Sequence, residues 1–218
     1  MSKINKMGNE EEPKSICIKG FTFIDLGLPS GLLWASKNIG AENETDAGNH
    51  YAWGEIETKA KYDWSTYKWG TGSEGNVTKY VPQRLAGWCG GFYDSKTTLN
   101  NTDDIAHVLL GCGCRIPRQK DFEELFENTF CKTTTVNGVD GIVFLSKNND
   151  EEVFLPVAGF SFENDNKERY LKYWSSSLYT VYPDEATVLV SFGDLTILGH
   201  EARCVGLPIR PVMSKKVR

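Results

Sequence analysis

The chain has 218 residues, of which 40% are hydrophobic, 24% charged and 12% aromatic, with a formal net charge of -5. This length and composition predict one ordinary globular domain with a full hydrophobic core, and they exclude a largely disordered chain. The only basic cluster is Lys215, Lys216 and Arg218. We therefore expect no binding to nucleic acid through its phosphates.

The N-terminal residues 1–15 are polar and acidic and are expected to form a flexible arm before a domain that spans residues 16–213. The first residues lack the apolar core of a signal peptide, so we do not expect a typical secretory precursor. No apolar run approaches the roughly 20 residues needed to cross a bilayer, so no membrane insertion is expected. The six cysteines are scattered, and most are expected to be free and packed.

Partly alternating apolar and polar residues, broken by turn-forming residues, predict strands at residues 16–26, 32–40 and 51–56. The segment that follows is rich in Gly, Ser and Thr and carries Tyr62, Trp64, Tyr67, Trp69 and Tyr80. It shows no sustained periodicity, which is typical of a long loop held in place by buried rings. The alternative is that these rings form a stacking platform for sugars.

A first helix is predicted over residues 102–110, with an N-cap at Thr102. Its expected core face follows from the helical spacing of Ile105, Val108 and Leu109. His107 lies off this stripe and is expected at the surface.

A second helix is predicted over residues 118–128, directly after Pro117, which suits a helix entry. Its apolar stripe consists of Phe122, Leu125 and Phe126. The glutamates of this helix are expected to form a solvated face.

Two turn-forming pairs, Asn137-Gly138 and Asp140-Gly141, precede a predicted hairpin with strands at residues 142–145 and 153–157. Residues 160–172 are expected to form a polar loop. The last strands are predicted at residues 172–176, 186–192 and 205–212. Strands, two helices and more strands indicate an α+β fold, in which two helices pack on mostly antiparallel sheets with long ordered loops.

The sequence contains no pattern typical of catalysis. Its three histidines lie far apart, and no Ser/His/Asp spacing, glycine-rich phosphate loop or HExxH motif is present. Cys112-Gly113-Cys114 is too tightly spaced for a zinc site, and the acidic loops at 148–152 and 163–166 lack the spacing of a calcium loop. We therefore expect no catalytic residue, no metal and no cofactor.

The last fifth of the chain, residues 173–212, differs from the rest in composition. Asn is absent after Asn166, and no Lys lies between Lys172 and Lys215. Amphipathic rings and carboxylates occur there instead, and such residues supply contact area and hydrogen-bond acceptors in a paratope. The candidate ligand-binding residues are Tyr179, Thr180, Tyr182, Asp184, Glu185, Thr187, His200, Glu201 and Cys204, with Asp194 as a further acceptor.

Other residues of this region are expected to support the fold. Ala186, Leu189 and Phe192 are predicted to point inward, and Trp174 is predicted to be buried. Arg203 and Arg210 are expected to tie the last strands to neighbouring carbonyls or carboxylates.

Several stretches of the chain occur in the order in which a known family carries them. They are IDLGLPSGLLWA at 24–35, YAWGE at 51–55, DDIA at 103–106, RIP at 115–117, FLPVAG at 154–159, YWSS at 173–176 and RPV at 210–212. With them the chain resembles the paralogous-domain proteins of Bacteroidetes-type bacteria and their phages. Those proteins are similar to the C-type-lectin-like fold in its formylglycine-generating-enzyme variant, which the resemblance implies for this chain.

The family includes variable proteins of diversity-generating retroelements, in which adenines of a C-terminal repeat are mutagenised, typically at Asn codons. The resemblance implies that variation is placed between YWSSS at 173–177 and RCVGLPIRPV at 203–212. Most residues from 178 to 205 arise by changing the first two bases of AAC, whereas Glu185 and Glu201 do not.

The resemblance implies a non-enzymatic protein that binds a cell-surface protein or glycan. It would be displayed on a virion or a bacterial cell surface, and stay in the cytoplasm until assembly. Two alternatives are a carbohydrate-binding surface module and an oxidoreductase of the formylglycine-generating type. The second would need a cysteine pair for copper near the C-terminus, where this chain offers only Cys204.

Overall fold

The computed structural model describes residues 15–111, 113–162, 165–167, 171–193 and 195–215. The expected N-terminal arm, apart from Ser15, lies outside these residues, as do Cys112 and Asp194. Every strand pairing in the described part is antiparallel, and the helices are few and short. The predicted α+β class is therefore confirmed, and no helix of the described residues is long and apolar enough to cross a membrane.

The first sheet joins the beginning and the end of the domain. Its strands, in spatial order, are β1 (Ser15–Ile18), β2 (Phe21–Ile24), β3 (Leu32–Ala35), β13 (Val212–Ser214) and β4 (Cys114–Arg115). The predicted strand at 32–40 ends at Ala35, and the one at 51–56 is reduced to a single bridge between Tyr51 and Leu207. Residues 205–211, predicted as strand, run as buried irregular chain before β13.

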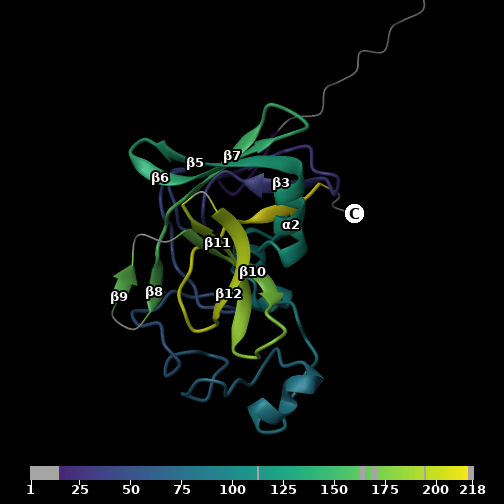
Figure 1. The fold of residues 1–218 in the computed structure, drawn as a ribbon, viewed down its shortest axis with the longest axis vertical. Helices are drawn as coiled ribbons and strands as arrows, with labels where there is room; N and C mark the ends of the chain where they lie inside the picture. The colour runs from purple at the N-terminus through teal and green to yellow at the C-terminus, as the bar shows by residue number, and fades with distance from the viewer. Residues whose placement is uncertain (1–14, 112, 163–164, 168–170, 194, 216–218) are drawn as a thin grey trace, which may run out of the picture.

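A second sheet consists of β5 (Thr129–Val136), β6 (Val139–Ser146) and β7 (Glu152–Pro156), and it lies at the top of Figure 1. Asn137 and Gly138, with φ of 51° and 81°, form the turn between β5 and β6, as predicted. The predicted turn at Asp140-Gly141 is wrong, because both residues lie in β6 and pair with Thr135 and Thr134 of β5. Strand β5 escaped prediction because its Thr-rich sequence is largely exposed and lacks clear alternation.

The segment expected as a polar loop contains a small hairpin of β8 (Phe160–Phe162) and β9 (Asp165–Lys167). The third large sheet follows it, with β10 (Leu171–Leu178), β11 (Glu185–Phe192) and β12 (Leu195–Ala202) in that order. β12 was not predicted. Figure 1 places this sheet in the middle of the molecule, with the long loops between β3 and α1 below it.

The helix α1 (Ile105–Leu110) follows a short 3-10 helix, η2 (Asn101–Asp103). Its N-cap is Asp104, whose side chain accepts a hydrogen bond from the His107 N–H, and not Thr102 as predicted. The predicted core stripe is also wrong, since Val108 and Leu109 are exposed. The buried residues of α1 are Ile105, Ala106 and Leu110.

The helix α2 (Gln119–Asn128) matches the predicted second helix closely. Phe122 and Leu125 are fully buried and Phe126 is partly buried, as the apolar stripe indicated. Asp121, in the first turn, is also buried and forms an ion pair with Arg115 at 2.5 Å. This pair joins α2 to β4.

Strands β10 and β11 of the third large sheet are buried on both faces over most of their length, whereas β12 is half-buried or exposed. On one face, Trp174, Val188 and Val190 pack with the aromatic loops. On the other face, Tyr173 and Leu189 pack against a core that includes Phe122 of α2 and Phe144 of β6. The central sheet is thus held rigidly, and only its edge strand and its ends reach solvent.

The aromatic loops between β3 and α1 behave as predicted for a loop held by buried rings. Tyr62, Tyr67 and Tyr80 are buried. Trp64 and Trp69 are half-buried and pack on the same core. These five rings therefore do not form an open platform for sugars.

Candidate binding surface

The C-terminal region is anchored by Arg203, which directly follows β12 and is fully buried. Its guanidinium donates to the Tyr67 hydroxyl at 2.9 Å, the Pro183 carbonyl at 2.7 Å and the Lys79 carbonyl at 2.9 Å. It also stacks over the Trp53 ring, with the Cζ atom 4.7 Å from the ring centroid. The predicted role of Arg203 is confirmed for carbonyls, and it fixes Pro183 just before β11.

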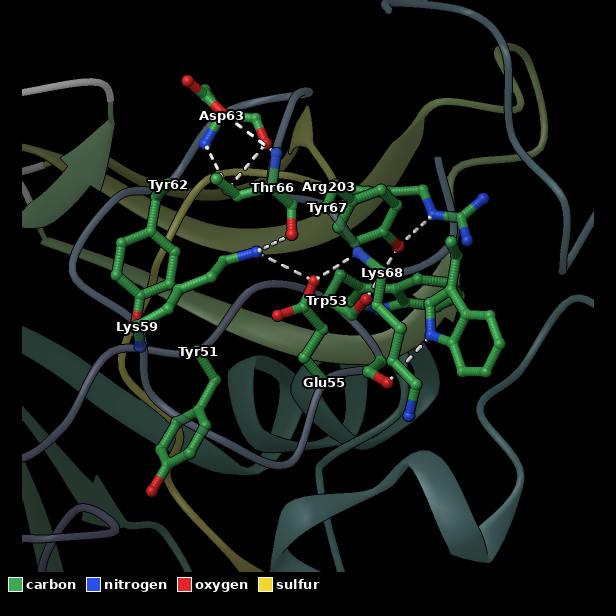
Figure 2. A network of polar contacts seen from close by, with 12 residues as sticks. Tyr51, Trp53, Glu55, Lys59, Tyr62, Asp63, Thr66, Tyr67, Lys68 and Arg203 are labelled. Atoms are coloured by element: carbon green, nitrogen blue, oxygen red, sulfur yellow. Dashed lines mark hydrogen bonds and ion pairs between the residues drawn. The ribbon is translucent and has the colours of Figure 1, made fainter. Parts of the chain in front are cut away.

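Around Arg203, a polar network secures the aromatic loops, as Figure 2 shows. The Glu55 carboxylate accepts from Lys59 Nζ at 2.9 Å and from the Lys68 N–H at 2.8 Å. Lys59 also donates to the Thr66 carbonyl at 3.0 Å. Burial raises the pKa of the Tyr67 hydroxyl, which therefore stays neutral beside the Arg203 guanidinium.

Trp174 and Arg210 are also buried anchors of the C-terminal region, and we call Trp174, Arg203 and Arg210 its frame. Trp174 is buried as predicted, and its indole N–H donates to the Tyr51 carbonyl at 2.7 Å. Arg210 is also fully buried, and it donates to Asn38 Oδ1 at 2.9 Å and to the Ala35 carbonyl at 3.0 Å. These contacts tie the last part of the chain to β3 and the loop that follows it.

The loop between β10 and β11, residues 179–184, projects from this frame. Its ends are closed by hydrogen bonds from the Tyr179 N–H to the Glu185 carbonyl at 3.2 Å and from the Arg203 N–H to the Asp184 carbonyl at 2.9 Å. The Arg84 guanidinium, from the 3-10 helix η1 (Gln83–Cys89), donates to the Thr180 carbonyl. The loop is therefore supported from two sides.

Rings from three segments meet on this loop. The Tyr179 ring stacks on the His200 ring, with centroids 4.2 Å apart and planes at 8°. Tyr182 lies 6.3 Å from Tyr179 and 6.1 Å from Trp88 of η1. Trp88 is 63% exposed and Tyr182 42% exposed. We call the ring series Trp88, Tyr182, Tyr179 and His200, with Glu185, the aromatic surface.

Glu185 supplies the charge of the aromatic surface. One of its carboxylate oxygens lies 2.7 Å from His200 Nδ1. Burial raises the pKa of Glu185 above its ordinary value, the His200 ring opposes this, and the charges of Asp184 and Glu201 add to it. The carboxylate and the imidazole thus form a polar end to a row of rings.

Two of the predicted binding residues are buried and do not belong to the aromatic surface. Thr187 is 3% exposed in the central strand β11, and its hydroxyl has no hydrogen-bond partner among the described residues. Cys204 is fully buried in the core, and burial raises the pKa of its thiol to about 12. Such a thiol is a poor nucleophile and a poor metal ligand at neutral pH.

Glu201 is separated from the aromatic surface by the geometry of β12. It pairs with Ala186, whereas His200 pairs with Thr187, so Glu201 and His200 point to opposite faces of the sheet. Its carboxylate forms an ion pair with Lys172 at 2.5 Å. The structure therefore brings together Tyr179, Tyr182, Glu185 and His200, with Thr180 and Asp184 in the same loop, and leaves Glu201 on the other face.

The inward positions of β11 are partly as predicted. Ala186 and Leu189 are fully buried. Phe192 is 53% exposed, so its prediction as a core residue is wrong. It lies at the end of the β11–β12 hairpin, opposite Leu195, where the strands extend past the core.

Comparisons of the chain with protein-family models, with curated proteins and with solved structures find no match. Among the described residues, no three His, Cys, Asp or Glu side chains gather closely enough to hold a metal ion.

Two residues of the surface region were missed in the sequence. Trp88 and Arg84 lie on η1, far from residues 179–185 along the chain, and their proximity depends on tertiary packing. The surroundings of Trp88, Gly87 and Gly90-Gly91, are typical of an exposed turn. This local composition indicates that Trp88 is exposed, but it does not indicate that Tyr182 is its neighbour.

His50 illustrates a histidine with a structural role. Its two ring nitrogens contact Ser161 Oγ at 2.8 Å and the Ala158 carbonyl at 2.9 Å. Burial lowers the pKa of His50, which favours the neutral ring. His50 therefore links the loop before Tyr51 to β8 and is not available to a ligand.

Proposed function

We propose that this chain is a non-enzymatic ligand-binding protein that recognises a cell-surface protein or glycan through the aromatic surface. The observation that carries the proposal is the continuous series of rings from Trp88 to His200, which η1, the loop at 179–184 and β12 contribute, and in which Trp88, Tyr182 and His200 are exposed. Large aromatic rings lose little side-chain entropy on binding and supply most of the energy at recognition sites.

The support beneath the surface favours binding over a purely structural role. Arg203 fixes Pro183, and Arg84 fixes Thr180, so the loop is ordered before a ligand arrives. Pre-organised loops avoid part of the entropy cost of association. An exposed Trp and Tyr pair that packs edge to face, at 67°, contributes little to the core and is well placed for contact with a partner.

The sequence resemblance extends this proposal to the architecture and the setting. We infer a C-type-lectin-like domain, with residues 173–212 as the candidate variable region, and display on a phage virion or a bacterial cell surface. The antiparallel sheets, the few helices and the long ordered loops are compatible with that fold. Trp174, Arg203 and Arg210 of this region are buried, whereas Val181 and Tyr182 of its loop at 179–184 are exposed. A variable protein needs such a separation, because its exposed residues must change without disturbing the buried ones.

The binding proposal is tested with fluorescently labelled chain on intact cells of Bacteroidetes strains. We expect saturable binding that Trp88→Ala and Tyr182→Ala each weaken about tenfold or more. The matched control is Phe130→Ala, which removes an exposed ring from β5 and should leave binding unchanged. Saturable binding that neither variant weakens would refute the assignment of the surface.

Pretreatment of the cells separates the two ligand classes. Loss of binding after periodate treatment indicates a glycan, and loss after protease treatment indicates a protein. The variable-protein inference is tested in the genome, where an invariant repeat beside a reverse transcriptase gene should differ from the codons for residues 178–205 only at adenines. Mismatches at other bases would refute it.

A further inference from the structure

The strand β12 forms an open edge of the central sheet. The sheet order is β10-β11-β12, and β12 pairs only with β11 among the described residues. Beyond that pairing, the only backbone-to-backbone hydrogen bond of β12 among the described residues is a turn from the Val205 N–H to the Ala202 carbonyl, and the Ala202 N–H donates to the Glu201 carboxylate. Alternate residues of an edge strand direct their N–H and C=O groups outward, so β12 presents unpaired groups to solvent.

Over residues 195–199, this edge lacks the charged residues, prolines and bulges that usually prevent strand addition. Natural edges carry Lys, Pro or bulges. The sequence of β12, LTILGHEA, contains no Lys, Arg or Pro, and its register with β11 runs from Leu195 to Ala202 without a bulge. The edge strand β5, in contrast, carries Lys132, and Lys147 lies over its exposed Phe130 ring at 5.2 Å.

Apolar side chains gather along the same edge. Phe192 and Leu195 are directly opposite each other, and Ile197 is opposite Val190, so all three point to one face of the sheet. They are 53%, 57% and 40% exposed. On the other face, Cys131 of β5 approaches the Thr196 hydroxyl at 3.5 Å, a contact between side chains that leaves the backbone edge open.

We propose that β12 pairs antiparallel with β12 of a second copy of this chain, about a two-fold axis at Ile197. In a continuous sheet, two directly opposed residues point to the same face, whereas neighbours along a strand point to opposite faces. The two-fold axis must therefore pass through a residue, because an axis between two residues would oppose side chains of different faces. In the register centred on Ile197, each Ile197 lies opposite the Ile197 of the other copy. Each Leu195 lies opposite the Gly199 of the other copy. Gly199 has no side chain of its own to clash with Leu195 of the second copy, and its neighbours Val188 and Val190 are already buried.

The neighbouring registers fit less well. An axis at Leu198 places Leu195 opposite Glu201, and an axis at Gly199 places Ile197 opposite Glu201. The Glu201 carboxylate already forms an ion pair with Lys172 at 2.5 Å, which an apolar neighbour would desolvate without compensation. An axis at Thr196 sets Leu195 against Ile197, but it pairs only residues 195–197 of β12 with the second copy, whereas the Ile197 axis pairs residues 195–199. Among the registers that pair at least five residues of β12, only the Ile197 register sets both Leu195 and Ile197 against an apolar residue or glycine, and this self-complementarity favours a second copy over a foreign strand.

The dimer does not depend on the proposed binding function, but it would affect it. A two-fold axis perpendicular to the sheet keeps the same face of both copies on one side. Each His200 lies three residues from Ile197, so the two aromatic surfaces would be roughly 20 Å apart on that side, at ~3.3 Å per residue of strand. Such a dimer would bind a ligand-bearing surface bivalently and gain avidity.

The association is tested by sedimentation velocity of the full chain over a range of concentrations. We expect a monomer-dimer equilibrium, and Ile197→Lys should give a monomer at every concentration while keeping the far-UV circular dichroism of the parent. The matched control, Phe130→Lys, adds the same charge to the exposed edge of β5 and should still dimerise. A parent chain that stays monomeric throughout, or an Ile197→Lys variant that still dimerises, would overturn the proposal.

Cross-linking tests the register. Opposed residues of antiparallel strands have Cα atoms about 4.5 to 5.5 Å apart, within reach of a disulfide. Under mild oxidation, Ile197→Cys should therefore form a covalent dimer on a non-reducing gel, above the background that the exposed Cys17 and Cys131 give in the parent. Leu195→Cys, which faces Gly199, should not exceed that background; stronger cross-linking of Leu195→Cys than of Ile197→Cys would exclude this register.

Discussion

The imidazole of His200 stacks on the phenol ring of Tyr179, with centroids 4.2 Å apart and planes at 8°, and this contact joins β12 to the loop after β10. His200 is also 2.7 Å from the Glu185 carboxylate, so one side chain connects three segments of the aromatic surface. The ring pair therefore helps to set the conformation of the loop that we propose to bind ligand.

The first prediction concerns the energy of this ring pair. Aromatic pairs contribute about 0.5 to 1.5 kcal/mol beyond their buried area, so Tyr179→Ala and His200→Ala should show a coupling of that size in a double-mutant cycle. The measurement is urea unfolding of the parent, both single variants and the double variant. His200→Phe, which preserves a flat ring, should retain most of the stability. Additive losses in the cycle would show that the rings do not interact in solution.

The parts of the fold that were predictable from the sequence depend on short-range patterns. Pro117 and the stripe of Phe122 and Leu125 defined α2, because helix entry and helical periodicity are both local. The same holds for the Asn137-Gly138 turn, whose positive φ angles suit those two residues.

The parts that were not predictable depend on tertiary context. In β12, exposed Leu195 and Ile197 alternate with half-buried Thr196 and Leu198, so apolar residues point to both faces and no strand alternation is visible. The approach of Trp88 to Tyr182 joins segments remote in the chain. Thr187 and Cys204 have the residue types of a binding surface, but β11 carries Thr187 into the core and the turn after β12 carries Cys204 there.

The second prediction follows from the raised pKa of Glu185. A carboxyl whose pKa is raised by folding holds its proton more tightly in the folded than in the unfolded state. Its contribution to stability is therefore full below the ordinary value of 4.5 and is lost as the pH rises through the raised value. Glu185→Gln does not titrate, so the stability of this variant relative to the parent should increase across that window.

The measurement is urea unfolding of the parent and Glu185→Gln at a series of pH values from below 4.5 to neutral. The exposed Glu127 of α2 provides the control, because Glu127→Gln should show no comparable increase. A difference between parent and Glu185→Gln that stays constant or falls with pH would contradict the burial of this carboxyl.

The third prediction concerns Arg203. Arg203→Met removes three hydrogen bonds and leaves the Pro183 and Lys79 carbonyls without donors in a buried site. We expect the free energy of unfolding to fall by about 2 to 4 kcal/mol. Arg203→Lys keeps the charge but not the planar fork, so it should recover only part of the loss.

Urea unfolding measures both Arg203 variants, and Arg118→Lys is the control, because Arg118 is exposed at the start of α2. Full stability in Arg203→Lys would mean that charge alone, and not the geometry of three acceptors, holds the loop. Binding of labelled Arg203→Lys to cells should also weaken, since the Pro183 carbonyl positions the loop before β11.

The fourth prediction separates the observed N-cap of α1 from the one expected in the sequence. Asp104 accepts from the His107 N–H at 3.0 Å and from the Ile116 N–H at 2.9 Å, and it is buried. Asp104→Ala removes a cap and leaves the Ile116 N–H without an acceptor, which should cost about 2 to 4 kcal/mol. Asp104→Asn retains an acceptor oxygen and, because burial raises the pKa of Asp104, avoids a buried charge, so it should lose less.

Thr102→Ala is the matched control, because Thr102 is the N-cap that local sequence favours but is exposed two residues before Asp104, in η2. Its loss should stay within about 0.5 kcal/mol, the usual range for exposed sites. Urea unfolding compares the three variants. If Thr102→Ala lowers the free energy of unfolding more than Asp104→Ala does, α1 begins at Thr102. The hydrogen bond from the Ile116 N–H to Asp104 would then not hold α1 against the entry to α2.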